Sequence, residues 1–99
     1  MKTIIIVTAY GEDTYYQKQY EDVVGLYSDV DKAIEGARAD GMTNRQLDDF
    51  HHQNGWALLT AAMMHNQESK AIQVDYSEEM DLRRKPCTSS YMFKTYNVI

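Results

Sequence analysis

Four potential metal ligands stand close together in the middle of the sequence, Asp48-Asp49 and His51-His52. On a helix, Asp48 and His52 are four residues apart and lie on the same face, where both side chains could bind one divalent cation. His65 could add a third ligand if the helix bends back. The glutamate of the histidine-rich protease motif is absent. A hydrated helix face accounts for these residues more simply, so we predict no metal site.

The residues that could support nucleophilic catalysis or phosphate binding are scattered. Cys87 follows Arg84 and Lys85, whose positive charges favour the reactive thiolate, but no local partner marks it as a nucleophile. The basic run 83–85 could bind a phosphate backbone, although nearby acids such as Asp81 make a solvated loop the simpler interpretation. No glycine-rich phosphate-binding loop is present. We therefore predict a non-enzymatic protein without catalytic residues or cofactors.

The most informative surface is the acidic, tyrosine-rich segment 10–27. Tyrosine gives a large contact area at low entropic cost and is favoured at protein interfaces. Alternatively, the rings cover the edge of a small core. We predict that this segment binds a partner through Glu12, Asp13, Tyr15, Tyr16, Tyr20, Glu21 and Asp22.

The first half of the chain is expected to form two strands. Residues 3–10 are β-branched, aromatic and apolar on both faces, which predicts a central strand covered on both sides. The second cover is a helix, a partner subunit or a target protein. Residues 11–22 form either a long hairpin loop or an irregular strand extension. A second strand follows over 22–27, with Val24 and Leu26 on one face.

Helix signals follow this hairpin. We expect Ser28 to cap a helix that ends at Gly41. Thr43 and Gln46 form a capping box that starts a second helix. The dipeptide at 54–55 predicts a break or kink, after which residues 56–65 form a separate short helix or continue the same one.

The second half of the chain closes the sheet. Alternation over 70–76 directs Ile72, Val74 and Tyr76 to the core, and residues 90–99 form the last strand. The fold class is therefore α+β, with an antiparallel sheet of about four strands. Its elements follow the order strand-strand-helix-helix-strand-strand, with the helices packed on the sheet.

The composition fits a single globular domain, residues 1–99, with 43% hydrophobic and 25% charged residues. The longest apolar run, residues 4–7, is too short for a membrane span or a signal-peptide core. A single cysteine is typical of a reducing compartment, so we expect a cytoplasmic protein.

The formal net charge of −5 lies in the first half, where residues 1–50 hold ten acids and five bases, whereas residues 51–99 hold five of each. This argues against direct nucleic-acid binding, which needs a basic stripe. It suits a partner with a basic surface.

The first forty residues resemble small uncharacterised bacteriophage and mobile-element proteins of the strand-strand-helix type. The likeness is carried by Val24, Gly25, Leu26, Tyr27, Ser28, Lys32 and Ala33. It includes no catalytic signature and implies a fold and a genomic setting.

These observations lead to one function hypothesis and two alternatives. The first is a phage accessory protein that binds and inhibits a host protein, such as a CRISPR, restriction or other defence component, in the host cytoplasm. The second is a small-molecule or metal-binding module, with a pocket between the sheet and the second helix near Trp56, His51 and His52. The third is a structural homodimer that buries the spare face of the first strand.

Overall fold

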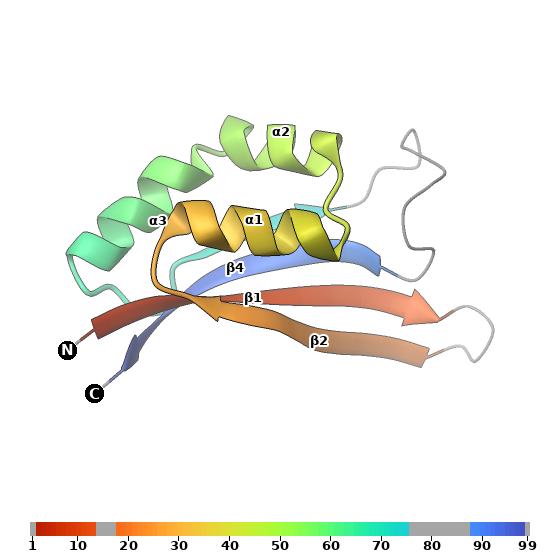
Figure 1. Ribbon diagram of the computed structural model, residues 1–99, viewed down its shortest axis with the longest axis horizontal. Coiled ribbons are helices and arrows are strands. Elements are labelled where there is room, and N and C mark those ends of the chain that lie inside the picture. Colours follow the sequence, from red (N-terminus) through yellow and green to blue (C-terminus); the bar gives the residue numbers. More distant parts are fainter. Residues whose placement is uncertain (1, 14–17, 76–87, 99) are drawn as a thin grey trace.

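The computed structural model describes residues 2–13, 18–75 and 88–98, and it describes the side chains of all of these except 12, 13, 18–20, 88 and 89. Four strands and three helices are present in these ranges (Figure 1). In chain order they are β1 (Lys2–Asp13), β2 (Lys18–Tyr27), α1 (Val30–Asp40), α2 (Asn44–His52), α3 (Gly55–Met64), β3 (Ala71–Asp75) and β4 (Thr88–Val98).

The strands form one antiparallel sheet in the order β2-β1-β4-β3. The predicted α+β class and the central place of the first strand are therefore confirmed. Strand β1 pairs with β4 from Lys2 opposite Val98 onward, which places the two ends of the chain side by side (Figure 1). The element order has three helices rather than two, because Asn54 adopts a left-handed conformation (φ 60°) and separates α2 from α3.

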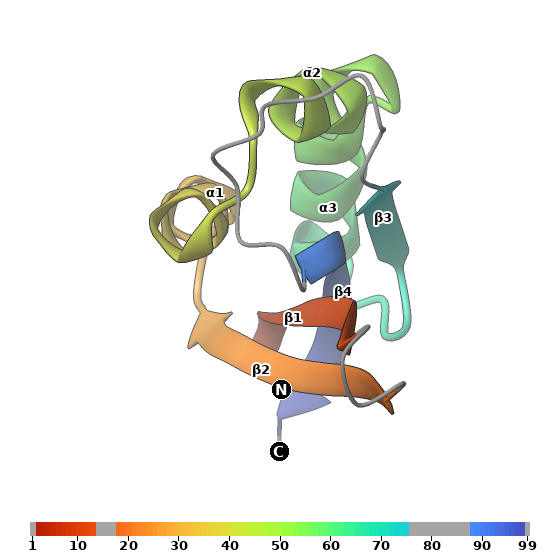
Figure 2. The ribbon, with the colours of Figure 1, turned by 90° about the vertical axis from the view of Figure 1, so that its right-hand side faces the viewer.

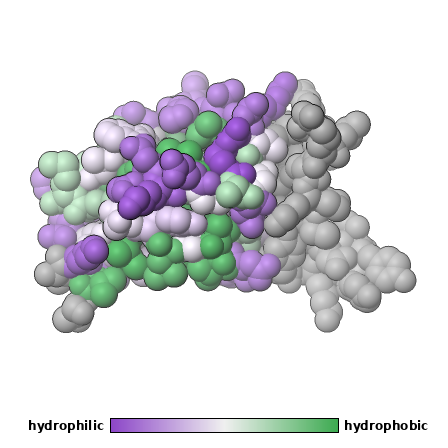
Figure 3. All heavy atoms as spheres, viewed as in Figure 1, coloured by the Kyte–Doolittle hydropathy of each residue, from purple (hydrophilic) through white to green (hydrophobic). Residues whose placement is uncertain are grey.

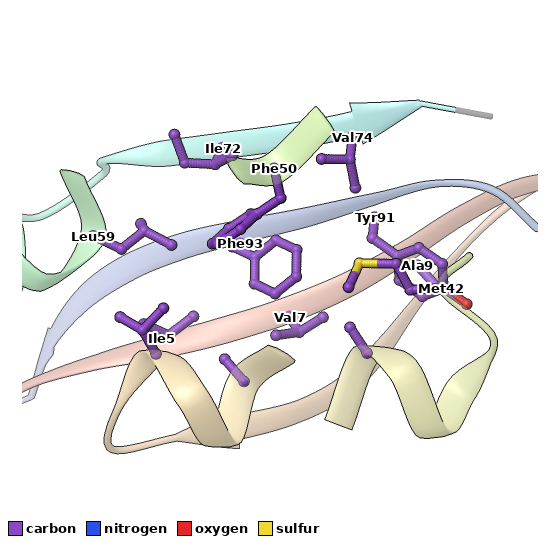
Figure 4. Close-up of a cluster of buried hydrophobic side chains, with 13 residues drawn as sticks. Ile5, Val7, Ala9, Met42, Phe50, Leu59, Ile72, Val74, Tyr91 and Phe93 are labelled. Atoms are coloured by element: carbon purple, nitrogen blue, oxygen red, sulfur yellow. The ribbon is translucent and has the colours of Figure 1, made fainter. Parts of the chain in front are cut away.

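The three helices all lie on one face of the sheet (Figure 2). The core fills the space between these two layers, and Figure 4 shows Phe50 of α2 against Phe93 of β4 at its centre, with ring centroids 4.8 Å apart. From β1, Ile5 and Val7 point into this core and are fully buried. Burial of such side chains is the main source of stability in a domain of this size.

Residues 11–13 belong to β1 and residues 18–22 belong to β2, which agrees with the strand-extension alternative for this segment. The ladder of the β1–β2 hairpin continues to Asp13 opposite Lys18, with one irregularity between Val7 and Thr8. There, Gly25 pairs with Val7 and Val23 pairs with Thr8, so one extra residue is inserted in β2.

This β-bulge corrects the prediction that Val24 and Leu26 share a face. Val24 packs against the core, whereas Leu26 pairs with Ile6 and is 62% exposed. A bulge changes the alternation of a strand by one residue, and so Val23 and Leu26 are the two apolar side chains that β2 presents away from the helices.

The helix ends follow local capping rules, with one correction. The cap of α1 is Asp29 and not Ser28, since the Asp29 carboxylate accepts a hydrogen bond of 2.8 Å from the backbone N–H of Lys32. Gly41 ends this helix at φ 130°, as predicted. The capping box of Thr43 and Gln46 is confirmed at the start of α2.

Strands β3 and β4 also behave as expected. Ile72 and Val74 are buried and alternate with exposed neighbours, while Tyr76 lies outside the described residues. Tyr91 and Phe93 are fully buried on β4. No helix in the described part of the chain is long and apolar enough to cross a membrane.

Candidate functional site

The sheet face opposite the helices, here called the open face, is not covered by any described element. Residues that pair across neighbouring strands lie on the same side of a sheet. Each set of paired residues therefore forms one row across the open face. The open face comprises Lys2, Ile4, Ile6, Thr8 and Tyr10 of β1, Glu21, Val23 and Leu26 of β2, Ser90, Met92, Lys94, Tyr96 and Val98 of β4, and Ala71, Gln73 and Asp75 of β3.

Apolar side chains dominate the middle of the open face. Val23 and Leu26 are each 62% exposed there, and Val98 at the terminal end is 45% exposed. Ile6 of β1 and Met92 of β4 lie in the rows of Leu26 and Val23 and are half-buried. In Figure 3 the hydrophobic side chains gather along the lower edge of the molecule, over the strands and away from the helices. Contiguous exposed apolar surface of this kind marks interaction sites.

Charges on the open face are separated along the strands. Glu21 pairs with Tyr10, and Asp75 pairs with Ser90, in the same register row near the hairpin. Lys94 lies four residues from Ser90 along β4, with its Nζ 5.5 Å from the ring centroid of Tyr96. The open face thus has an acidic end, an apolar middle and two lysines, Lys94 and Lys2, toward the chain termini.

The predicted partner-binding residues fall on the far part of the hairpin. Glu12 pairs with Gln19, Asp13 with Lys18, and Tyr20 with Gly11. These register positions bring the acids of both strands together at one end of the sheet. Tyr15 and Tyr16 lie outside the described residues.

The two exposed acids of this set with described side chains, Glu21 and Asp22, lie on opposite faces of the sheet. Glu21 pairs with Tyr10 on the open face, and Asp22 pairs with Ala9, whose side chain is in the core layer. The acidic charge therefore surrounds the hairpin instead of forming one flat face. Sequence alone did not distinguish these arrangements, because the strand register was unknown.

Tyr10 is tied to this acidic end. Its hydroxyl donates a hydrogen bond of 3.4 Å to the Glu21 carboxylate. Burial, and then the negative charge of Glu21, raise the pKa of Tyr10 above its ordinary value of 10.0. Tyr10 therefore acts as a neutral hydrogen-bond donor and holds Glu21 on the open face.

A separate pocket lies between the start of α1 and α3, with a volume of about 240 Å³. It is lined by Ser28, Asp29, Val30, Asp31, Trp56, Thr60, Met63 and Met64. Trp56 is 46% exposed, and its Nε1–H donates a hydrogen bond of 2.9 Å to Asp31. A pocket therefore adjoins Trp56, but it lies between α1 and α3 instead of between the sheet and the second helix, and neither His51 nor His52 lines it.

The potential catalytic and metal-binding residues do not converge. His51, His52 and Asp48 are exposed on α2, and no group of three or more His, Cys, Asp or Glu side chains within the described ranges could hold a metal ion. Cys87 and the basic run 83–85 lie outside those ranges.

Searches against protein-family models, curated proteins and solved structures found no match to this chain. The resemblance of the first forty residues to small phage proteins thus stays a prediction.

Proposed function

We propose that this protein is a non-enzymatic inhibitor that binds a host protein with a basic surface through the far end of its β1–β2 hairpin. The observation that carries the proposal is the paired register of the hairpin, which joins Glu12 and Asp13 of β1 to the part of β2 that carries Glu21 and Asp22. Lys18 is the only base on these paired strand ends.

The shape of the hairpin suits entry into a groove. Strands β1 and β2 extend past the ends of α1 and α2 (Figure 1). Because Glu21 and Asp22 are exposed on opposite faces, a partner that surrounds the hairpin would meet negative charge on both sides. Complementary charge of this kind speeds association and selects the partner.

The finer proposal is that the target is a defence component of a bacterial host and that the protein acts in the host cytoplasm. Such complexes hold nucleic acid in basic grooves, and an acidic hairpin competes for the same positive charges. The phage setting is supported by the resemblance carried by residues such as Gly25 and Lys32.

Charge reversal of the hairpin tests this function. The chain is used to capture partners from a bacterial lysate, and the captured protein is then assayed for loss of its own activity. We expect the four-fold variant with Glu12, Asp13, Glu21 and Asp22 changed to Lys to lose both capture and inhibition. We also expect wild-type binding to weaken as salt concentration rises.

A matched pair of variants separates position from net charge. Glu21→Lys with Asp22→Lys changes the charge by the same amount as Glu35→Lys with Glu68→Lys, whose side chains are exposed on α1 and after α3. Only the hairpin pair should weaken capture. Equal capture by a folded four-fold variant and the wild type would rule out the hairpin as the binding surface.

A second candidate function is supported by the pocket at Trp56. An indole, two methionines, and the carboxylates of Asp29 and Asp31 suit a small organic cation, which binds over an aromatic face and near negative charge. Trp56 is the single tryptophan of the sequence, so its fluorescence reports on this site. Saturable quenching by arginine methyl ester, reduced in Asp31→Asn, is the expected result, and an unchanged spectrum would exclude this function.

A further inference from the structure

We propose that two copies of this chain form a symmetric dimer by packing their open faces together, with the strands of the two copies running in opposite directions. This inference does not depend on the proposed function of the hairpin. It is centred on the apolar middle of the open face and shares only the row of Glu21 with the hairpin surface of the inhibitor proposal.

Counted with the rows of the hairpin, the open face approaches the size of a standard interface. Strands about 4.8 Å apart with a rise of about 3.3 Å per residue make a face of roughly 15 by 30 Å for the ten-residue overlap of β2, β1 and β4. Side chains raise the accessible area above that projection, toward the roughly 800 Å² per partner of a standard interface.

The chemistry of the open face matches an interface core. Val23 and Leu26 expose most of their surface to water, and they adjoin Ile6, Thr8 and Met92 through the register. Packing two such faces together buries these side chains from both copies at once. Each aliphatic side chain that becomes buried favours association through the hydrophobic effect, which must exceed the cost of association.

The distribution of charge selects a second copy as the occupant and fixes its direction. Lys94 lies in the register row of Ile6, and Asp75 lies in the row of Tyr10. The row of Thr8 and Met92 lies midway between them. A two-fold axis that crosses the sheet at this middle row, perpendicular to the strands, exchanges the two outer rows.

In that arrangement, Lys94 of each copy faces the Asp75 end of the other copy, and Glu21 lies in the same row. The face is therefore complementary to itself, as a two-fold interface requires. If the strands ran in the same direction, Lys94 would face the apolar row of Ile6 and Leu26 and would be buried without a carboxylate partner, which is costly. Asp75 already accepts a hydrogen bond of 3.0 Å from Gln73 on this face, which orients its carboxylate.

The reversed arrangement also has a geometric consequence. Because β1 and β2 carry the hairpin at one end of each sheet (Figure 1), the two hairpins of the dimer point away from each other. The open-face side of each hairpin lies against the terminal half of the other copy, because the row of Glu21 faces the row of Lys94, whereas Asp22 on the opposite side of the hairpin stays exposed.

Sedimentation equilibrium of the full chain across the micromolar range tests the proposal. We expect a mass of twice 11.5 kDa. Leu26→Lys should give a monomer, since it places a charge in the apolar middle of both copies. The matched control is Met64→Lys, which changes a side chain that is 74% exposed on α3 and should leave the dimer intact.

Charge exchange tests the direction of the strands. Lys94→Glu should weaken the dimer by roughly tenfold or more, equivalent to about 1.4 kcal/mol, and the double variant Lys94→Glu with Asp75→Lys should restore it. Circular dichroism confirms that each variant is folded. A monomeric mass for the wild type, a dimer that survives Leu26→Lys, or a double variant no tighter than Lys94→Glu would overturn the proposal. None of these variants changes a hairpin acid, so their outcomes are separate from the test of partner capture.

Discussion

At the scale of single residues, Tyr27 occupies a narrow space between β2 and α1. A Cβ atom added to Gly36 would lie 1.9 Å from the Tyr27 hydroxyl oxygen and 2.3 Å from Cζ, and one added to Gly25 would lie 2.5 Å from the same oxygen. Two glycines on different elements thus make room for one ring. Gly36 has this role because α1 packs against β2, which no local sequence pattern shows.

The substitution Gly36→Ala tests this arrangement, because the close approach of Tyr27 predicts a lower free energy of unfolding where helix propensity alone predicts a higher one. In an open helix position, Gly→Ala raises stability by about 1 kcal/mol. Here we expect Gly36→Ala to lower the free energy of unfolding by about 1–3 kcal/mol, because the ring must shift. Urea denaturation measures the change. Combining Gly36→Ala with Tyr27→Leu should remove the clash, whereas Tyr27→Phe should not, since Cζ stays in place. A stabilised Gly36→Ala protein would contradict the close approach.

The raised pKa of Tyr10 predicts that the protein loses stability at alkaline pH. Its pKa in the folded state is raised above 10.0 by burial and by Glu21, while the unfolded chain titrates near 10.0. Its contribution is complete below pH 10.0 and is lost as pH rises through the folded pKa. Tyr10→Phe should therefore lose less stability than the wild type between neutral pH and pH above 10.0 in urea denaturation. In Glu21→Gln, the Tyr10 pKa measured by NMR should move down toward 10.0; no movement would show that Glu21 does not act on it.

At the scale of elements, Ser28 and Asp29 are adjacent candidates for the N-cap of α1, and the backbone geometry identifies Asp29. Asp29 Oδ1 accepts the Lys32 N–H at 2.8 Å, and Ser28 precedes the cap. We expect Asp29→Ala to lower the free energy of unfolding by about 1 kcal/mol, and Ser28→Ala to change it by less than about 0.5 kcal/mol. Asp29→Asn retains an acceptor and should be close to the wild type. Thermal or urea unfolding measures all three, and a larger loss in Ser28→Ala would return the cap to Ser28.

Local signals predicted most helix and strand positions. Gly41 ended a helix because it tolerates φ 130°. Thr43 and Gln46 began the next because their side chains and backbone N–H groups bond reciprocally. These interactions involve residues three apart, so they are visible in a short stretch of sequence.

The sequence did not predict the features that depend on how distant strands pair, because the register of the strands was unknown. The bulge in β2 is defined by its register with β1, and it moves Val24 to the core and leaves Leu26 exposed. Glu21 and Asp22 were taken together as one surface, although neighbouring strand residues point to opposite faces. Serine and aspartate are both good caps, so only the backbone geometry identifies Asp29.

At the scale of the whole molecule, the placement of all three helices on one face decides which surfaces are free. The apolar second face of β1 was visible in the sequence as Ile4 and Ile6, but its cover was left open among a helix, a partner subunit and a target. The structure excludes a described helix on that side (Figure 2). The pocket at Trp56 likewise depends on how α1 and α3 meet, which no local pattern encodes.

The same topology predicts that the chain tolerates circular permutation. Lys2 pairs with Val98 on adjacent central strands, so a short glycine–serine linker can join the two ends, because neighbouring strands are about 5 Å apart. New ends are opened at 15–16, between β1 and β2. This permutant retains every strand, and its ladder of β1 with β4 becomes a local hairpin.

We expect the permutant to unfold cooperatively, with a free energy of unfolding within about 2 kcal/mol of the parent, since exchanging one loop closure for another has a small entropic effect. It should also fold faster, because pairing β1 with β4 no longer requires the two ends of the chain to meet across the whole sequence. Stopped-flow refolding and urea denaturation measure both quantities. A control permutant opened at 53–54, between α2 and α3, also joins β1 to β4 but keeps the native β1–β2 connection. If only the 15–16 permutant fails to fold, the covalent β1–β2 hairpin, and not the pairing of the chain ends, organises the sheet.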